Sequence, residues 1–247
     1  MARAHVECIH ESEVPWRPWT PPRGAPLEVK TLSWDPEGEN HTSLVRLARG
    51  WRQDELVAHP APEELFVIAG WLRLGDIDLK AYHYLRVPAG IRHGPAIAYE
   101  ETLAIWIVEG PYGPVSGRDP EVGELVHVDA QELAWRPTWV PGPRPGLFIK
   151  LLYMDPVTGA YTRLIRAEPG WREDRLEHHD CAEEAYTLEG EMYLGNTGRT
   201  WGRGSYFWRP PGIRHGPMHT ARGAVFFLRT DGPLVNHYTM PEDARLP

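Results

Sequence analysis

The sequence has few cysteines, no long apolar run and no cluster of basic residues, and each absence excludes a class of protein. With only Cys8 and Cys181 present, no disulfide framework can form, which is typical of a reducing compartment. The N-terminal residues lack the apolar run of a signal peptide, and no stretch approaches the roughly 20 apolar residues of a membrane-spanning helix. We therefore expect a cytoplasmic protein with no membrane partner.

The charge balance is acidic. Asp and Glu number 34 against 26 Lys and Arg, which gives a formal net charge of −8. Because a nucleic-acid backbone attracts clustered positive charge, nucleic acid is not an expected partner. The 247 residues, 42% of them apolar, are enough for one large or two modest globular domains.

Long helices are also disfavoured. The 24 Gly and 25 Pro interrupt the chain every few residues, and Pro is far above its average usage. Six short segments rich in β-branched and aromatic residues lie between these interruptions, and they read as strands. The sequence therefore predicts an all-β protein with strands at residues 42–47, 65–68, 103–108, 161–166, 185–188 and 224–228.

The second half of the chain repeats the first at a shift of about 120 residues. The longest match is six identical residues, Gly-Ile-Arg-His-Gly-Pro, at 90–95 and 212–217. Residues 110–120 are rich in Pro and Gly and read as a linker, so we expect domains at 1–120 and 121–247. Each half opens with a Pro-rich arm expected to cover the sister barrel or a second subunit; the arms carry Trp16, Trp19, Trp135 and Trp139.

Residues 177–184, Glu-His-His-Asp-Cys-Ala-Glu-Glu, have the spacing of a metal site on a β-sheet. Alternate side chains of an extended strand share a face, so residues 177, 179, 181 and 183 would point the same way, and His179 and Glu183 become candidate co-ligands. The rigid Pro-Pro-Gly turn at 210–212 would aim His215 at the same point. Such a set suits Fe(II), Mn(II), Zn(II) or Ni(II) and leaves positions open for a substrate. The alternative is a group of polar loop residues at a barrel rim.

These residues resemble the cupin superfamily, whose motifs are G-x5-H-x-H-x3-4-E-x6-G and G-x5-P-x-G-x2-H-x3-N. The resemblance covers nearly the whole chain as a bicupin, and it implies two tandem double-stranded β-helix (jelly-roll) barrels with a metal held by the motif residues. Among cupins the chain looks closest to the zinc-binding cupins of anti-sigma factors. The second half matches at His179, Glu183, Gly190, Gly204, Pro210, Gly212 and His215, with Glu177 at the place of the first His and His219 at the place of the Asn.

The first half keeps a smaller set of potential ligands. His59, Glu63 and His93 match the motifs, whereas Val57 stands at the place of the first His and cannot bind metal. Two histidines and one carboxylate form the set that non-haem iron enzymes use. The other interpretation is a degenerate barrel kept for packing.

Two residues of the second half leave alternatives open. Glu177 is either a fourth ligand, which would favour Mn(II) or Fe(II) over Zn(II), or a solvated loop residue. His219 is either a group that orients a ligand or a general base near the pocket mouth, and we take it as the catalytic candidate. Aromatic and apolar residues surround this site in sequence and indicate a small aromatic or carbonyl ligand: Tyr186, Trp201, Phe207, Trp208 and Met218.

The function expected from the sequence is metal-assisted conversion of a small organic substrate, without an organic cofactor. An Fe(II) dioxygenase is the leading hypothesis, because open positions on the ion can accept a chelating substrate. An isomerase or decarboxylase that uses the metal as a Lewis acid is the alternative, and a non-catalytic sensor of metal or small ligand is the rival from another class. The resemblance to cupins also implies a homodimer.

Overall fold

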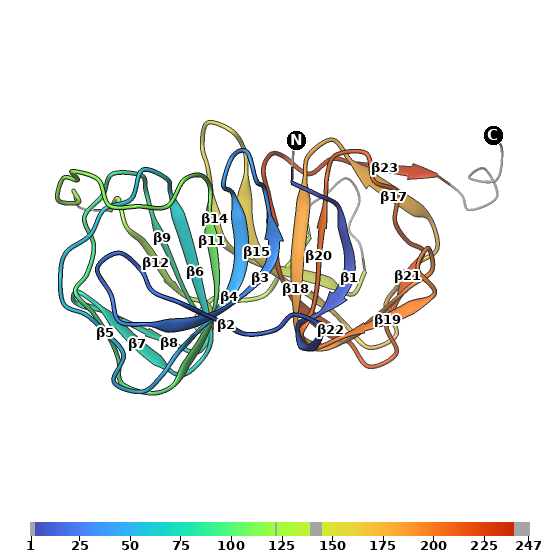
Figure 1. Cartoon of the computed structure of the whole chain (residues 1–247). Helices are drawn as coiled ribbons and strands as arrows, with labels where there is room; N and C mark the ends of the chain where they lie inside the picture. The colour runs from blue at the N-terminus through green and yellow to red at the C-terminus, as the bar shows by residue number, and fades with distance from the viewer. Residues whose placement is uncertain (1–2, 122, 139–144, 240–247) are drawn as a thin grey trace. The chain divides into compact units, whose positions relative to one another are not determined.

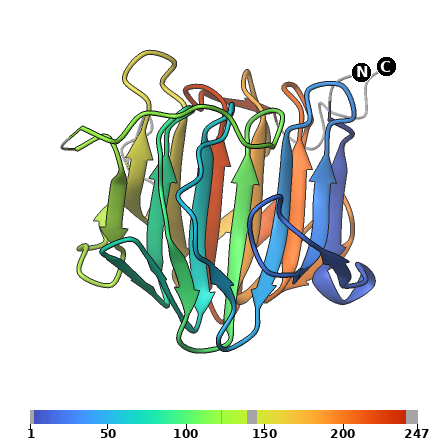
Figure 2. The same ribbon diagram turned by 60° about the vertical axis from the view of Figure 1, so that its left-hand side comes forward.

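The computed structural model describes residues 3–121, 123–138 and 145–239. These residues form β-strands joined by turns, with one 3-10 turn, η1 (Glu11–Glu13) (Figures 1 and 2). No helix in these ranges is long and apolar enough to cross a membrane. The prediction of an all-β chain is therefore confirmed.

The chain folds into two compact units. Unit 1 contains Met1–Ala4 and Val14–Glu132, and unit 2 contains His5–Glu13 and Leu133–Pro247. These bounds differ from the expected ranges 1–120 and 121–247, because a short strand at each junction pairs with strands of the other repeat. Each unit is a jelly-roll barrel made of antiparallel strands.

Unit 1 is built from a seven-stranded and a four-stranded sheet. In sheet order the larger one contains β12 (Val126–Asp129), β9 (His83–Val87), β6 (Glu63–Ala69), β11 (Thr102–Val108), β4 (His41–Leu47), β3 (Leu27–Trp34) and β2 (Arg17–Trp19). The smaller one contains β5 (Arg52–Gln53), β10 (Ala96–Ala98), β7 (Trp71–Leu74) and β8 (Ile77–Lys80).

Unit 2 repeats the order of the larger sheet. Its strands are β1 (Val6–His10), β20 (Ser205–Arg209), β18 (Glu183–Leu194), β22 (Ala224–Thr230), β15 (Tyr161–Ala167), β14 (Leu147–Met154) and β13 (Arg136–Pro137). The short strands β16 (Arg172–Glu173), β19 (Arg199–Gly202) and β21 (Met218–His219) extend this sheet from β18. A separate pair joins β17 (Leu176–His179) and β23 (Asn236–Thr239).

The opening strands of the two repeats are exchanged. β1 and β12 are counterparts, since each precedes the repeated Trp-Arg-Pro at residues 16–18 and 135–137. Nevertheless β1 pairs with β20 of unit 2, and β12 pairs with β9 of unit 1 (Figure 1). Each repeat therefore supplies the edge strand of the other repeat's sheet.

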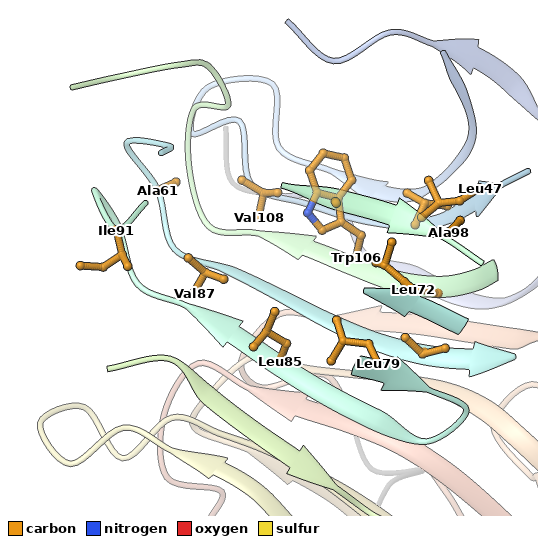
Figure 3. Packing of buried hydrophobic residues seen from close by; sticks show 14 residues of the cluster. Leu47, Ala61, Leu72, Leu79, Leu85, Val87, Ile91, Ala98, Trp106 and Val108 are labelled. Atoms are coloured by element: carbon orange, nitrogen blue, oxygen red, sulfur yellow. The ribbon is translucent and has the colours of Figure 1, made fainter. Parts of the chain in front are cut away.

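The six predicted strands are present as β4, β6, β11, β15, β18 and β22, of which β18 is longer than expected. In unit 1 buried apolar side chains form one core cluster, to which Trp106 belongs together with Leu72, Leu79 and Leu85 of β7, β8 and β9, each at most 3% exposed (Figure 3). Along β4 and β11 nearly every position is buried.

The described Trp side chains of the two arms contact residues of their own unit, and the expectation that the arms cover a sister barrel or a second subunit stays a prediction. The Trp16 ring lies under the cations of Lys30 and Arg46, at 4.8 and 4.6 Å from the ring centroid, inside unit 1. Trp135 has the same arrangement in unit 2, where Lys150 and Arg166 lie over its ring. Trp19 packs into the unit 1 cavity against Trp106, and Trp139 lies outside the described residues.

Candidate metal centres

In unit 1, a backbone bridge and a turn hold the candidate ligands of the first centre. The amides of Val57 and His93 each donate to the other's carbonyl oxygen, at 3.0 and 2.9 Å. The amide of Gly90 donates to the His59 carbonyl at 2.8 Å, and Gly90 has a φ of +73°, a conformation that glycine adopts without steric cost. The repeated Pro-x-Gly turn therefore fixes both histidines by main-chain bonds, and Glu63 opens β6 beside them.

The unit 1 side chains converge. One ligand atom from each of His59, Glu63 and His93 lies within 4.8 Å of the others. Oε1 of Glu63 is 2.9 Å from Nε2 of His93, and its Oε2 accepts a hydrogen bond of 2.9 Å from the indole of Trp106. Although burial raises the pKa of the Glu63 carboxyl, the hydrogen bond and charge of His93 lower it to about 2. Glu63 is therefore an anion at neutral pH.

Unit 2 builds its centre on the same backbone frame. The amides of Glu177 and His215 donate to each other's carbonyl oxygens, both at 2.9 Å, and Gly212 donates to the carbonyl of His179 at 2.9 Å. Glu177 and His179 alternate along β17 and are both buried, as an extended strand requires. The chain bends at residues 180–181, so Glu183 begins β18 and does not continue the face of β17.

The unit 2 ligand atoms also converge. One atom from each of Glu177, His179 and His215 lies within 4.8 Å of the others. Oε1 of Glu177 is 3.5 Å from Nε2 of His215. Oε2 of Glu183 is 3.7 Å from Nε2 of His179 and 3.9 Å from Nε2 of His215, and Nη1 of Arg209 is 3.3 Å from it.

All four histidines are oriented in the same way. Nδ1 of His59, His93, His179 and His215 faces a backbone carbonyl oxygen at 3.1, 3.1, 3.4 and 3.2 Å, respectively. A carbonyl oxygen can only accept, so Nδ1 of each ring carries a proton and Nε2 faces the centre. Burial lowers the pKa of both His59 and His179, which favours the neutral form of these two rings. Although burial also acts on His93, the hydrogen bond and charge of Glu63 raise the pKa of that ring.

The residues fit a divalent ion. Nε2 of His179 is buried and has no hydrogen-bond partner among the described residues, although a buried polar atom normally has one. Neutral imidazole and carboxylate donors are the ligands that Fe(II), Mn(II), Zn(II) and Ni(II) accept. The two groups of candidate ligands are buried, except for Glu63, which is partly buried.

Each centre opens into a cavity of about 110 Å³ in its own unit. The unit 1 cavity has apolar and aromatic walls, including Trp19, Trp51 and Tyr112, and the Tyr112 ring stacks on His59 with centroids 4.0 Å apart. The unit 2 cavity contains two buried arginines, Arg163 and Arg209, among its lining residues. The cavities are alike in size and differ in charge.

Several sequence predictions about the cavity differ from the structure. His219 lies on β21 with an exposed side chain against the ring of Tyr193, and it is not among the residues that line the unit 2 cavity. In the sheet, β21 pairs with both β16 and β18, where His219 stands opposite Arg172 and Tyr193. Of the predicted aromatic and apolar wall, Trp201, Phe207 and Met218 line the cavity, whereas Tyr186 and Trp208 do not.

The sequence did not reveal the residues that contact the carboxylates. Trp106 and Arg209 bond Glu63 and Glu183, and they come from neighbouring strands far away in the sequence. Arg209 comes directly before the Pro-Pro-Gly turn, and in the strand pairing it lies opposite Glu183. A sequence analysis that had predicted the register of these two strands could have identified Arg209 as the partner of Glu183. Trp106 lies outside every motif.

Solved structures share this fold at low identity. A "putative dioxygenase" from Nostoc punctiforme is 23% identical with a TM-score of 0.86, and the match covers 97% of this chain and 87% of that one. A "putative glyoxylate induced protein" from Pseudomonas aeruginosa is 17% identical with a TM-score of 0.66, over 90% and 86% of the two chains. The formate complex of Lactobacillus farciminis oxalate decarboxylase is 14% identical with a TM-score of 0.64, over 100% and 91%.

These structures confirm the predicted cupin jelly-roll fold. They give no support to the resemblance to anti-sigma-factor cupins. A search of the curated proteins finds no match. One protein-family model, described as "Domain of unknown function (DUF4437)", matches residues 7–237, which is nearly the whole chain, and the chain therefore belongs to the DUF4437 family.

Proposed function

We propose that this protein is a metal-dependent enzyme that binds one divalent ion in each unit and converts a small organic substrate. The observation that carries the proposal is the common orientation of the four histidines, whose Nδ1–H groups are held by backbone carbonyls so that Nε2 faces the centre. A purely structural histidine does not need this arrangement in both copies of a repeat. The ligands proposed are His59, Glu63 and His93 in unit 1 and His179 and His215 with a glutamate in unit 2.

The unit 1 cavity supports an oxygenase that acts on a small aromatic or carbonyl compound. When bound there, an iron ion would supply Lewis acidity and redox chemistry. The protein's own contribution is the apolar wall, which excludes water, and the Tyr112 ring, which fixes His59 by stacking. Trp106 holds the second oxygen of Glu63 and thereby keeps the other oxygen turned toward His93.

The unit 2 cavity favours a second candidate, a Lewis-acid decarboxylase or isomerase with an anionic substrate. Arg163 lines this cavity, and a guanidinium group is suited to binding a carboxylate; Arg209 also lines it, with its guanidinium bonded to Glu7 and Glu183. Oxalate decarboxylases share the fold, at identities that support the fold alone. The two candidates share the need for metal and differ in substrate charge.

The test begins with metal content. Untagged protein purified without chelator should contain up to two equivalents of iron, manganese, zinc or nickel by plasma mass spectrometry. His93→Ala should lose one equivalent and His215→Ala the other, since each variant removes a ligand from a different unit. Oxygen consumption with small aromatic and diketone compounds, compared with CO2 release from small carboxylates, then separates the two candidates. Absence of metal even after reconstitution would overturn the proposal.

A further inference from the structure

Unit 1 has a second cavity beside the one that contains the candidate metal ligands. This outer cavity is lined by residues of β2, β3, β4 and β11 together with Glu39 and Tyr112, and none of the three candidate ligands of unit 1 lines it. Its volume is about 410 Å³, compared with about 110 Å³ for the cavity of the centre. Pockets for small organic molecules measure roughly 300–1,000 Å³, so the outer cavity lies within this range and the cavity of the centre lies below it.

Three aromatic side chains form a partition between the two cavities. Trp19, Trp106 and Tyr112 belong to the walls of both. Their ring centroids are 5.4, 5.4 and 5.0 Å apart, which are the distances of aromatic rings in direct contact. The indole of Trp106 also donates a hydrogen bond of 2.9 Å to Glu63. The partition is therefore a fixed wall, with the metal centre on one side and the outer cavity on the other.

The jelly-roll fold does not require this partition, because unit 2 has no aromatic residue at the equivalent positions. These positions follow the repeated Arg-Pro, share the register of the central strand pair, and precede the carbonyl that bonds the first histidine. In unit 2 they are occupied by Thr138, Leu228 and Leu234, and all three line the cavity of the unit 2 centre. The aromatic partition is therefore a property of unit 1 and not of the common frame.

The far wall of the outer cavity is also aromatic. Trp34 stacks on His41 with ring centroids 5.8 Å apart and an interplanar angle of 26°, and it is 45% exposed. His41 in turn meets Trp106 edge to face at 4.9 Å. A planar ring that entered this cavity could pack against Trp34 and the partition, and it would cover an indole surface that otherwise remains in water.

His41 supplies a polar group inside these aromatic walls. Its side chain lines the cavity and is 8% exposed, and Nδ1 lies 3.3 Å from the Ser43 hydroxyl. Nε2 has no hydrogen-bond partner among the residues that the structure describes. A hydroxyl group both donates and accepts, so a hydroxyl on the ligand suits Nε2 in either tautomer. The charged residues of the lining, Arg17 and Glu39, are exposed and opposite in sign, which favours a neutral ligand.

We propose that the outer cavity is a binding site for a neutral hydroxylated aromatic compound, a phenol or a naphthol. The ring packs against Trp34 and the partition, and the hydroxyl group bonds Nε2 of His41. This site is separate from the metal centre and needs no metal ion. It therefore goes beyond the function proposed above and can be tested independently of it.

Calorimetric titration of the full-length protein with 2-naphthol tests the site. Wild type should bind one equivalent, with the same affinity before and after treatment with ethylenediaminetetraacetate. Trp34→Ala should weaken binding about tenfold, because the indole is a stacking surface of the outer cavity and does not line the cavity of the centre. Met154→Ala is the matched control: Met154 occupies the same register in unit 2, is 41% exposed, and should leave binding unchanged. Thermal unfolding establishes that both variants are folded.

A second comparison tests the role of His41. His41→Leu should weaken the binding of 2-naphthol about tenfold and leave that of naphthalene nearly unchanged, since only the first ligand has a hydroxyl group to bond Nε2. If this variant does not fold, equal affinity of the wild type for 2-naphthol and naphthalene would refute the contact with His41. Absence of saturable binding, equal affinities in Trp34→Ala and Met154→Ala, or loss of binding on chelation would overturn the site. Saturable binding by a protein that takes up no metal would overturn the proposed function and support this inference.

Discussion

Removal of the N-terminal strand is expected to destabilise unit 2 and to leave unit 1 folded. A chain that starts at Val14 lacks β1, which pairs with β20 at Val6, Ile9 and His10. Unit 1 keeps all the strands of its two sheets, because its edge strand β12 comes from after the first repeat. Unit 1 loses Arg3, which donates to the Thr42 hydroxyl, but no strand, so the larger effect is expected in the half of the chain that is remote in sequence from the deletion.

The cost follows from the contacts that are lost. Deletion removes Glu7 and leaves Arg209 buried beside Glu183, and loss of one member of a buried ion pair costs about 3–5 kcal/mol. It also removes the hydrogen bond of 2.5 Å from the Tyr186 hydroxyl to Glu11 and that of 2.8 Å from the Glu11 amide to Gly204. Together these losses reach at least about 5 kcal/mol, which is comparable with the whole stability of a domain.

Hydrogen exchange read by mass spectrometry gives the local answer. Peptides from β20 and the start of β18 should lose protection in the truncated chain, and peptides from β9 and β6 should keep it. A synthetic peptide of residues 3–13 added in trans should restore protection to β20, since the strand pairs through its own backbone and side chains. Retained protection in β20, or loss confined to β9, would refute the exchange of opening strands.

Three further predictions follow from single positions. Gly190→Ala should destabilise the protein by about 3 kcal/mol or more, because the added Cβ would lie 2.0 Å from the Gly223 carbonyl oxygen. Gly198 has a similar positive φ but open space around it, so Gly198→Ala should cost only about 1–2 kcal/mol. Urea unfolding of the two variants gives the comparison. Burial and the charge of Arg3 lower the pKa of His41 to about 4, below its ordinary 6.5, so the unfolded chain binds more protons than the folded chain between these pH values. The free energy of unfolding should therefore fall by up to about 3 kcal/mol as the pH drops from about 6.5 to 4. In urea unfolding measured across that range, His41→Gln should flatten this dependence. Burial raises the pKa of the Cys181 thiol to about 12. Iodoacetamide at pH 8 should therefore alkylate this thiol in the unfolded protein and leave it unmodified in the native chain. Rapid labelling of the native protein would contradict the burial.

The sequence predicted the elements that a local pattern encodes. A content of β-branched and aromatic residues between Gly and Pro interruptions was enough for the six strands, and the repeated Gly-Ile-Arg-His-Gly-Pro turn identified His93 and His215. These features depend on neighbours in the chain, so they can be read without the fold. The cytoplasmic location and the homodimer stay predictions, and light scattering on the purified protein would test the second.

The parts that were missed depend on pairing between distant segments. The domain boundary shifted because β1 and β12 pair across the repeat, a choice that no local pattern records. Glu183 was expected on the same face as Glu177 because the segment reads as one strand, but the chain bends between them and starts a new strand. His219 followed the cupin motif in spacing, yet strand pairing with β16 turned it to the surface.

The two units use one backbone frame for two different electrostatic environments. The bridges and the Pro-x-Gly turn are the same in both, so the histidines are placed by main-chain bonds that do not depend on the cavity walls. The residues that line the two cavities differ at equivalent positions. Trp106 pairs with Ser43 in unit 1, whereas Leu228 pairs with Arg163 at the same register in unit 2. Unit 1 therefore holds its glutamate with a neutral indole donor inside an apolar cavity, whereas unit 2 places guanidinium groups around its centre. Because a metal's Lewis acidity and a substrate's charge both respond to such neighbours, the duplicated centres are suited to different ligands despite their common geometry.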